Sequence, residues 1–473
     1  MSTVRVIETD YLVVGAGASA MSFADTLIAR SPAEVVMVDR RAAPGGHWID
    51  AYPFVRLHQP SACYGVPSRV LGQDRIDEHG PNIGFYERAR GDEIRDYFAQ
   101  VMEQNLLPSG RVTFLPLTDY RGEESDGHHL MSRFTGAETI VKVRARLVDA
   151  TTLQSEIPAR HALPFAVDDG VPVLPPNDLG DLGEIGGSFT VIGAGKTAMD
   201  TCGWLLEMGV DPDRIRWIRT RESWLFDRAV FQPLERVAAY MRLQADWVEA
   251  AGAASDSSAF CHDLEDRGAF LRIDPAAEPE IWRGATISRA EVAALQTIQR
   301  IVRGHHVARI SDGGITLAGG DQLPSDPGEV YVDCTAAGVP QAPAAPVFEP
   351  GRIAMRFVTV GLTTYSAAII GAVEAMSVDE TTKNKLTVPV PFSGEADRSL
   401  EVAHAALLSD VARTRHEELF NWNQSCRLNP ARGAAERMAD DPELIAAFSS
   451  LVTAVGPTLR KLGGRTGLAA APA

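Results

Sequence analysis

Two short glycine-rich segments have the residue types and the spacing of turns that hold a diphosphate. They read Gly15-Ala16-Gly17-Ala18-Ser19-Ala20 and Gly193-Ala194-Gly195-Lys196-Thr197-Ala198. Each follows a short apolar run, at residues 11–14 and 188–192, and each leads into helix-forming residues. Glycine allows a tight turn and the close approach of a pyrophosphate, whose charge the N–H groups of the helix N-terminus can stabilise. The pattern predicts two separate dinucleotide-binding units in one chain.

The residues after the first turn suit the adenosine end of a dinucleotide and then a flat ring. A second apolar strand, expected at 35–38, ends at Asp39, where a carboxylate can accept hydrogen bonds from a ribose. The chain continues Arg40-Arg41-Ala42-Ala43-Pro44-Gly45-Gly46-His47-Trp48. This combination resembles the first motif of the flavin-containing and Baeyer–Villiger monooxygenases. The resemblance implies FAD at this unit, with Gly45, Gly46 and Trp48 along the flavin and with Arg40 and His47 as further contacts.

The second turn differs from the first in its charged residues. Gly195-Lys196-Thr197 imitates the phosphate loop of nucleoside triphosphatases, but that motif needs glycine at position 190, where this chain has Thr190. The strand expected at 214–218 is followed by Arg219-Thr220-Arg221, where an NAD site has an acid. A guanidinium can make a forked contact with phosphate oxygens, so Arg219 and Arg221 favour NADPH over NADH. A solvated strand end is the alternative role for these arginines.

The resemblance covers most of residues 5–375 and implies an NADPH-dependent flavin monooxygenase. In that chemistry NADPH reduces FAD, dioxygen gives a flavin hydroperoxide, and one oxygen atom passes to a small organic substrate. The flavin-containing monooxygenases place an asparagine beside the flavin, where this chain has His58 and Gln59. These two residues are therefore candidates for a polar catalytic contact, with a structural loop role as the alternative.

Two other functions stay open on the sequence. A flavin-dependent oxidase or dehydrogenase would use the same fold to move hydride from a substrate to FAD without inserting oxygen. A non-catalytic dinucleotide-binding sensor is the second, because Thr152 and Ala336 stand at strand ends where the resembling family has glycine. A disulfide reductase is not supported, since the five cysteines are scattered along the chain.

The motif positions define the expected domain organisation. The fold class is α/β, with two Rossmann-like domains for FAD and NADPH, the second inserted into the first, and with added helices. The expected ranges are 1–160 for the first part of the FAD domain and 161–325 for the NAD(P)H domain, with a helical insertion at about 226–304. Residues 326–473 are expected to form the second part of the FAD domain, which the strand-like run at 330–336 re-enters, and C-terminal helices.

The charge and the sequence patterns of the chain indicate which partners and which location to expect. The 62 acidic and 45 basic side chains give a net charge of −17, which disfavours nucleic acid as a partner. The first ten residues lack the pattern of a secretory signal, so a cytoplasmic protein is expected. The most apolar stretch, 357–376, reads as a buried helix, and no membrane partner is expected. The histidine pairs at 128–129 and 305–306 lack companion ligands, so no metal site is expected. A homo-oligomer is left open.

Overall fold

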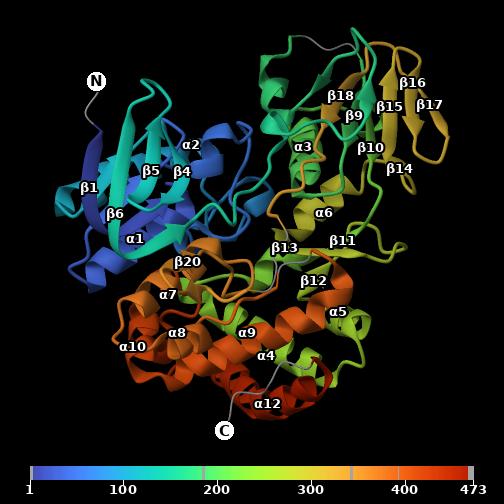
Figure 1. Ribbon diagram of the computed structural model, residues 1–473. Coiled ribbons are helices and arrows are strands. Elements are labelled where there is room, and N and C mark those ends of the chain that lie inside the picture. Colours follow the sequence, from blue (N-terminus) through green and yellow to red (C-terminus); the bar gives the residue numbers. More distant parts are fainter. Residues whose placement is uncertain (1–3, 184–186, 341–344, 392–393, 467–473) are drawn as a thin grey trace.

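The computed structural model describes residues 4–183, 187–340, 345–391 and 394–466. The chain forms a first domain (blue and cyan), a second domain (green and yellow) and a layer of helices, mostly orange and red, that lies beneath both (Figure 1). Each domain is built on a parallel sheet. The strands of the first sheet come from segments that precede and follow the second domain along the chain. This confirms the predicted α/β class, with one domain inserted into the other.

Strand β1 lies at the centre of the first sheet, and its neighbours follow the order of a doubly wound fold. The order is β19-β20-β6-β1-β2-β3, and the pairs from β20 to β3 are parallel. Val14 pairs with Val38, so β1 and β2 end side by side at the first glycine turn. A hairpin of β4 and β5 joins the edge of β6. The strands are β1 (Arg5–Val14), β2 (Val35–Val38), β3 (Val112–Leu115), β4 (Thr118–Glu124), β5 (Gly127–Ser132), β6 (Glu138–Asp149), β19 (Phe348–Glu349) and β20 (Arg352–Ala354).

The second sheet has the order β14-β10-β9-β18-β8, and all of its pairs are parallel. The prediction that residues 330–336 return the chain to the first domain, with a boundary at 325/326, is wrong. Strand β18 instead pairs with β9 and β8, and the chain re-enters the first sheet only at β19 and β20. An apolar strand that ends in small residues suits either sheet, and pairing alone decides between them. The strands are β8 (Val173–Leu174), β9 (Phe189–Ile192), β10 (Ile215–Ile218), β14 (Arg300–Val302) and β18 (Val330–Asp333).

The expected helical insertion at 226–304 is only partly helical. Its two long helices, α4 (Val237–Ala253) and α5 (Ser257–Asp266), pack with the C-terminal helices, but a three-stranded sheet and a strand of the second domain share the same segment. That sheet consists of β11 (Ser223–Asp227), β12 (Phe270–Leu271) and β13 (Ile281–Ile287), and α6 (Arg289–Leu295) follows it. A further sheet covers the second domain, with β7 (Ala166–Val167), β15 (Val307–Ser311), β16 (Gly314–Leu317) and β17 (Gln322–Pro324).

The predicted buried helix at 357–376 is confirmed as α7 (Thr363–Glu374), which packs along α1 (Ala18–Arg30). The two helices approach closely because Gly371 has no side chain: a Cβ there would lie 2.8 Å from the carbonyl oxygen of Phe23. The remaining helices are α2 (Gly91–Val101), α3 (Lys196–Glu207), α8 (Glu380–Leu386), α9 (Ser399–Arg415), α10 (Glu417–Ser425), α11 (Ala434–Arg437) and α12 (Pro442–Thr466).

Helix α12 packs on α4 at the base of the molecule (Figure 1). The Lys461 ammonium donates hydrogen bonds to the carbonyls of Gly252, Ala253 and Ala254, which caps the C-terminal end of α4. Among the described residues, the span Pro442–Gly464 is long and apolar enough to cross a membrane by length and composition, and 17% of its apolar 18-residue window is buried. A single such helix is weak evidence for a membrane segment.

Candidate functional site

A cavity of about 780 Å³ lies between the two domains. It opens beyond the carboxyl ends of β9, β10 and β18, the position at which doubly wound sheets bind ligands. Its volume is that of a site for a cofactor or a drug-sized molecule. Of the predicted site residues, its wall includes His47, Trp48, His58, Gln59, Gly193, Gly195, Lys196, Thr197 and Arg221.

The first glycine turn adjoins the cavity through the segment at 45–48. Gly15 has a φ of +104°, and the N–H of Gly45 donates to the carbonyl of Ala16 at 2.9 Å. A Cβ on Gly46 would lie 2.9 Å from the Cα of Gly17, so this close approach of the two backbones needs glycine at position 46. The chain then runs from this contact directly to His47 and Trp48 on the cavity wall.

Asp39 closes the first turn from the end of β2. Its carboxylate accepts hydrogen bonds from the N–H groups of Ala16 and Arg41, each at 2.7 Å. The neighbouring Arg40 is exposed, and its carbonyl accepts from the guanidinium of Arg133. Ala20 is fully buried in the first turn of α1. These contacts hold Asp39 beside the turn.

Trp48 brings an aromatic ring from the first domain to the cavity. Its indole N–H donates to the Tyr64 hydroxyl at 2.8 Å, and the ring of His47 lies 4.9 Å from it, centroid to centroid. Burial, followed by the charge of Arg41 and opposed by Asp50, lowers the pKa of His47 to about 4. The imidazole is therefore neutral at pH 7. Gly361 and Thr363, at the start of α7, line the same cavity.

The second glycine turn lies on the cavity wall itself. Gly193 has a φ of +143°, and a Cβ there would lie 2.5 Å from the carbonyl oxygen of Cys334. Gly195 has open space around it. Among the described residues no side chain caps the N-terminus of α3 at Gly195, nor that of α1 at Gly17. Uncapped helix N-termini leave N–H groups for an anion.

Lys196 belongs to a contact between the domains that the sequence analysis missed. Its ammonium forms an ion pair with Asp200, one turn further along α3. Asp200 also accepts a hydrogen bond from the Tyr52 hydroxyl of the first domain at 2.8 Å. The spacing of four residues between lysine and aspartate is a helical ion-pair signal that the sequence does contain.

The two arginines predicted for a 2′-phosphate lie in different environments. Arg221 lines the cavity, and its guanidinium lies 3.1 Å from the Glu395 carboxylate. Arg219 is 2% exposed and points inward, with its Nε 2.9 Å from Glu222 and its guanidinium 4.5 Å above the Trp217 ring. Of the pair, the structure therefore brings only Arg221 to the cavity.

Arg283 of β13 is a cavity residue for which the sequence shows no motif. Its guanidinium donates to the carbonyl of Ala337 at 2.7 Å. Burial and the nearby charge of Arg221 lower its pKa, whereas Glu395 opposes the shift. The cavity wall carries four basic side chains and two acidic ones, although the whole chain is acidic. They are Arg56, Lys196, Arg221 and Arg283, with Asp50 and Glu156.

His58 lies on the cavity wall, in a segment whose backbone is fixed by hydrogen bonds from other parts of the chain. The carbonyl of Leu57 accepts from Arg88 at 3.3 Å, and the carbonyl of His58 accepts from the hydroxyl of Thr286. Burial first, and then the charge of Lys196, lower the pKa of His58 to about 4. Neutral imidazole is thus the form that faces the cavity at pH 7.

Stability should fall as the pH falls from about 6.5 to about 4, because His58 has a pKa of about 4 in the folded chain and about 6.5 when unfolded. The unfolded state binds the proton first, so acid favours unfolding in this window. Between these pH values, the urea midpoint of His58→Asn should change less than that of the wild type. His305→Asn replaces an exposed histidine, and its urea midpoint should depend on pH as the wild type's does. Equal slopes for His58→Asn and wild type would contradict a neutral His58.

A buried charge cluster lies behind His58. Arg228 is fully buried, and its Nη2 is 2.7 Å from Glu291, although the angle is not that of a hydrogen bond. Arg88 lies 3.3 Å from the other carboxylate oxygen of Glu291. Burial alone would raise the pKa of Glu291, but Lys196, Arg228 and Arg88 together lower it to about 2. One carboxylate therefore balances two guanidinium groups.

The expectation that the histidine pair at 128–129 lacks companion ligands is wrong for His129. Its two ring nitrogens lie 2.8 Å from Asp126 and 2.7 Å from Glu138. With Glu124, which is 4.0 Å away, it forms a surface cluster on the β4–β5 hairpin. The hairpin register brings these residues together, so their positions in the sequence did not reveal the cluster. None of them lines the cavity.

Comparison with known proteins places the chain in a group of close relatives. No protein-family model matches it. The uncharacterized protein Rv2000 of Mycobacterium tuberculosis (strain ATCC 25618 / H37Rv) is 42% identical over 463 residues, which cover 97% of this chain and 85% of that protein. The chain belongs to the same family. The uncharacterized protein Mb2023 of Mycobacterium bovis is a further member, with the same identity and coverage.

Among solved structures, an open crystal structure of cyclohexanone monooxygenase shares the fold. The alignment covers 88% of this chain and 98% of that chain, with a TM-score of 0.50 and 13% sequence identity. At this identity the similarity establishes the fold alone. The expected resemblance to the flavoprotein monooxygenases is thereby confirmed at the level of architecture.

Proposed function

We propose that this family consists of FAD-dependent, NADPH-using oxidoreductases, and that this chain is a monooxygenase acting on a small organic substrate. The observation that carries the proposal is the single cavity that joins the segment after the first glycine turn to the second turn. Two dinucleotides at these turns would direct their reactive rings into one shared space. The fold shared with cyclohexanone monooxygenase supports the same reaction class, as an analogy of fold.

The residues of the first turn fit FAD. Gly15 makes the tight turn with a positive φ, Gly17 precedes an uncapped helix N-terminus, and Asp39 is held beside them by backbone N–H groups. From there Gly46 and Trp48 would lie along the flavin, and Trp48 reaches the cavity wall. When bound, FAD would accept a hydride from NADPH and pass that electron pair to dioxygen.

The residues of the second turn fit NADPH. Gly193 and Gly195 would hold its pyrophosphate at the N-terminus of α3, with Lys196 and Thr197 beside it. Arg221 would bind the 2′-phosphate. Arg219 is left out of this site because it is already paired with Glu222 inside the domain. The excess of basic side chains on the wall favours a polyanionic cofactor in a chain of net charge −17.

The other wall residues provide a polar setting for the substrate. His58 and Gln59 offer uncharged hydrogen-bonding groups, and the contacts of Arg88 and Thr286 fix the backbone that carries them. Arg283 adds a cation from the opposite domain, which can stabilise negative charge that develops on oxygen.

The reaction class can be tested with FAD-loaded protein and NADPH under nitrogen, followed by the admission of oxygen. The proposal predicts that NADPH bleaches the flavin and that isotopically labelled oxygen enters a ketone or heteroatom substrate from a small panel. Bleaching by substrate alone, without oxygen incorporation, would indicate an oxidase or dehydrogenase. Bound cofactors that do not react would indicate a sensor.

Arg221→Ala should raise the apparent dissociation constant for NADPH by about tenfold to a hundredfold, because a charge-assisted contact with the 2′-phosphate is lost. The constant for NADH should stay within about twofold. Arg309→Ala is the matched control, since Arg309 is exposed on the second domain and pairs with Asp168 outside the cavity. Equal losses for the two nucleotides would remove Arg221 from the 2′-phosphate site.

A further inference from the structure

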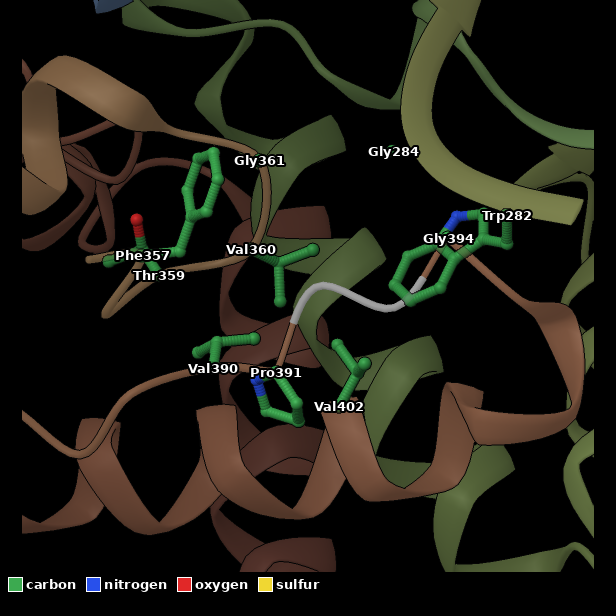
Figure 2. A pocket seen from close by; sticks show the side chains of 10 residues that line it. All are labelled: Trp282, Gly284, Phe357, Thr359, Val360, Gly361, Val390, Pro391, Gly394 and Val402. Carbon is green, nitrogen blue, oxygen red and sulfur yellow. The ribbon is translucent and has the colours of Figure 1, made fainter. Parts of the chain in front are cut away.

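A short segment around Glu395 runs antiparallel to β13, a strand that forms part of the cavity wall. The backbone N–H of Trp282 donates to the carbonyl of Gly394 at 3.1 Å, and Figure 2 shows these two residues next to each other. On the other side of Glu395, the N–H of Ala396 donates to the carbonyl of Glu280 at 2.9 Å. Because hydrogen bonds fix the backbone before and after it, Glu395 starts from a defined position beside the cavity.

The side chain of Glu395 contacts Arg221, the arginine that the proposed function assigns to the 2′-phosphate. Its two carboxylate oxygens lie 3.1 and 3.3 Å from the Nη1 of Arg221. The side chains of Arg221 and Glu395 are 34% and 37% exposed. Since solvent reaches both partners, water and salt screen this ion pair, and it contributes little free energy. A ligand with a stronger negative charge can therefore displace Glu395 from Arg221.

A second arginine lies close to the same carboxylate. A Cβ on Gly394 would lie 2.9 Å from the Nε of Arg283, so the segment passes directly against this guanidinium. Burial and the charge of Arg221 lower the pKa of Arg283, and Glu395 opposes that shift, so the three charges influence one another. Two arginines and one glutamate leave an excess of positive charge at the cavity wall. An anion is attracted there, but less strongly than the arginines alone would attract it.

We propose that Glu395 sets how strongly the site prefers NADPH over NADH. The assignment rests on the proposed function, in which Arg221 binds the 2′-phosphate. A 2′-phosphate must displace the carboxylate from Arg221 and then remain close to its negative charge, whereas the 2′-hydroxyl of NADH does neither. A carboxylate at the adenosine ribose is also the group that NAD sites use, because it accepts a hydrogen bond from that hydroxyl. Glu395 therefore weakens the binding of NADPH without weakening that of NADH.

Glu395→Gln tests this role, because it removes the charge and keeps the size of the side chain. In FAD-loaded protein, the dissociation constant for NADPH should fall by about threefold to tenfold, and that for NADH should stay within about twofold. Glu395→Ala should show the same difference between the two nucleotides, since the effect comes from the charge. Glu401→Gln is the matched control, because Glu401 pairs with Arg398 outside the cavity, and neither constant should change.

Two smaller ligands show which part of the nucleotide responds. Glu395→Gln should tighten the binding of adenosine 2′,5′-bisphosphate and leave that of adenosine 5′-monophosphate unchanged. An NADPH constant that does not fall in Glu395→Gln, or an equal change for NADPH and NADH, would overturn the role of Glu395. If Arg221→Ala still weakened NADPH binding in that case, the proposed function would stand. Failure of the wild-type protein to bind either nucleotide would refute the proposed function and, with it, the role of Glu395.

Discussion

Replacing Gly193 with alanine should abolish NADPH binding and lower the free energy of unfolding by about 3 kcal/mol. Alanine rarely adopts the φ of +143° found here, and its Cβ would overlap the carbonyl oxygen of Cys334. That oxygen belongs to the backbone after β18 and cannot move without disturbing the centre of the second sheet. The turn would then be displaced from the helix N-terminus at which we propose that the pyrophosphate binds.

Gly203→Ala provides the matched control within the same helix. Gly203 lies in the interior of α3 with no atom near its missing Cβ, so alanine there should raise stability by up to about 1 kcal/mol. Urea unfolding and NADPH titration of the two variants give the comparison. Tight NADPH binding by a folded Gly193→Ala protein would mean that the second turn is not the cofactor site.

Glu291→Gln should lower the free energy of unfolding by about 3–5 kcal/mol at neutral pH, because it removes the charge that balances Arg88 and Arg228 inside the protein. Both arginines are nearly or fully buried, so neither can recover its hydration. Arg228→Met should lower the free energy of unfolding much less, because it leaves a single Arg88–Glu291 ion pair. Urea unfolding of both variants at pH 7 measures the difference.

The loss of unfolding free energy caused by Glu291→Gln should become smaller at acidic pH. The pKa of Glu291 is about 2 in the folded chain, below its unfolded value of about 4.3. The ionised Glu291 therefore contributes its full share of the free energy of unfolding above the unfolded-state pKa. This share is lost as the pH falls toward the folded-state pKa. If Arg228→Met proved as damaging as Glu291→Gln at pH 7, the excess positive charge of the cluster would not be the cause.

The sequence was most informative where one residue type has a single physical use. Glycine at 15 and 193 is needed for positive φ, and Asp39 ends a strand at the spacing of a ribose contact, so the two turns could be predicted. The orientation of Arg219 could not be predicted, because it depends on contacts with Glu222 and the Trp217 ring that only the folded chain shows.

Other parts of the site depend on pairing between distant segments. Strand β18 has the pattern of a first-domain strand, and only its register with β9 reveals its sheet. Arg283 reaches the cavity because β13 pairs with β11, and no motif surrounds it. The contact of Tyr52 with Asp200 joins residues of different domains and depends on how the domains meet.

Whether the two glycine turns each hold a dinucleotide over one cavity can be tested on the purified protein. The most direct measurement is the flavin content of the purified chain, read from the spectrum of the cofactor released on denaturation, together with the anaerobic response to NADPH. We expect that each chain retains one FAD and that NADPH bleaches this flavin. A colourless protein that takes up no FAD on reconstitution would contradict it.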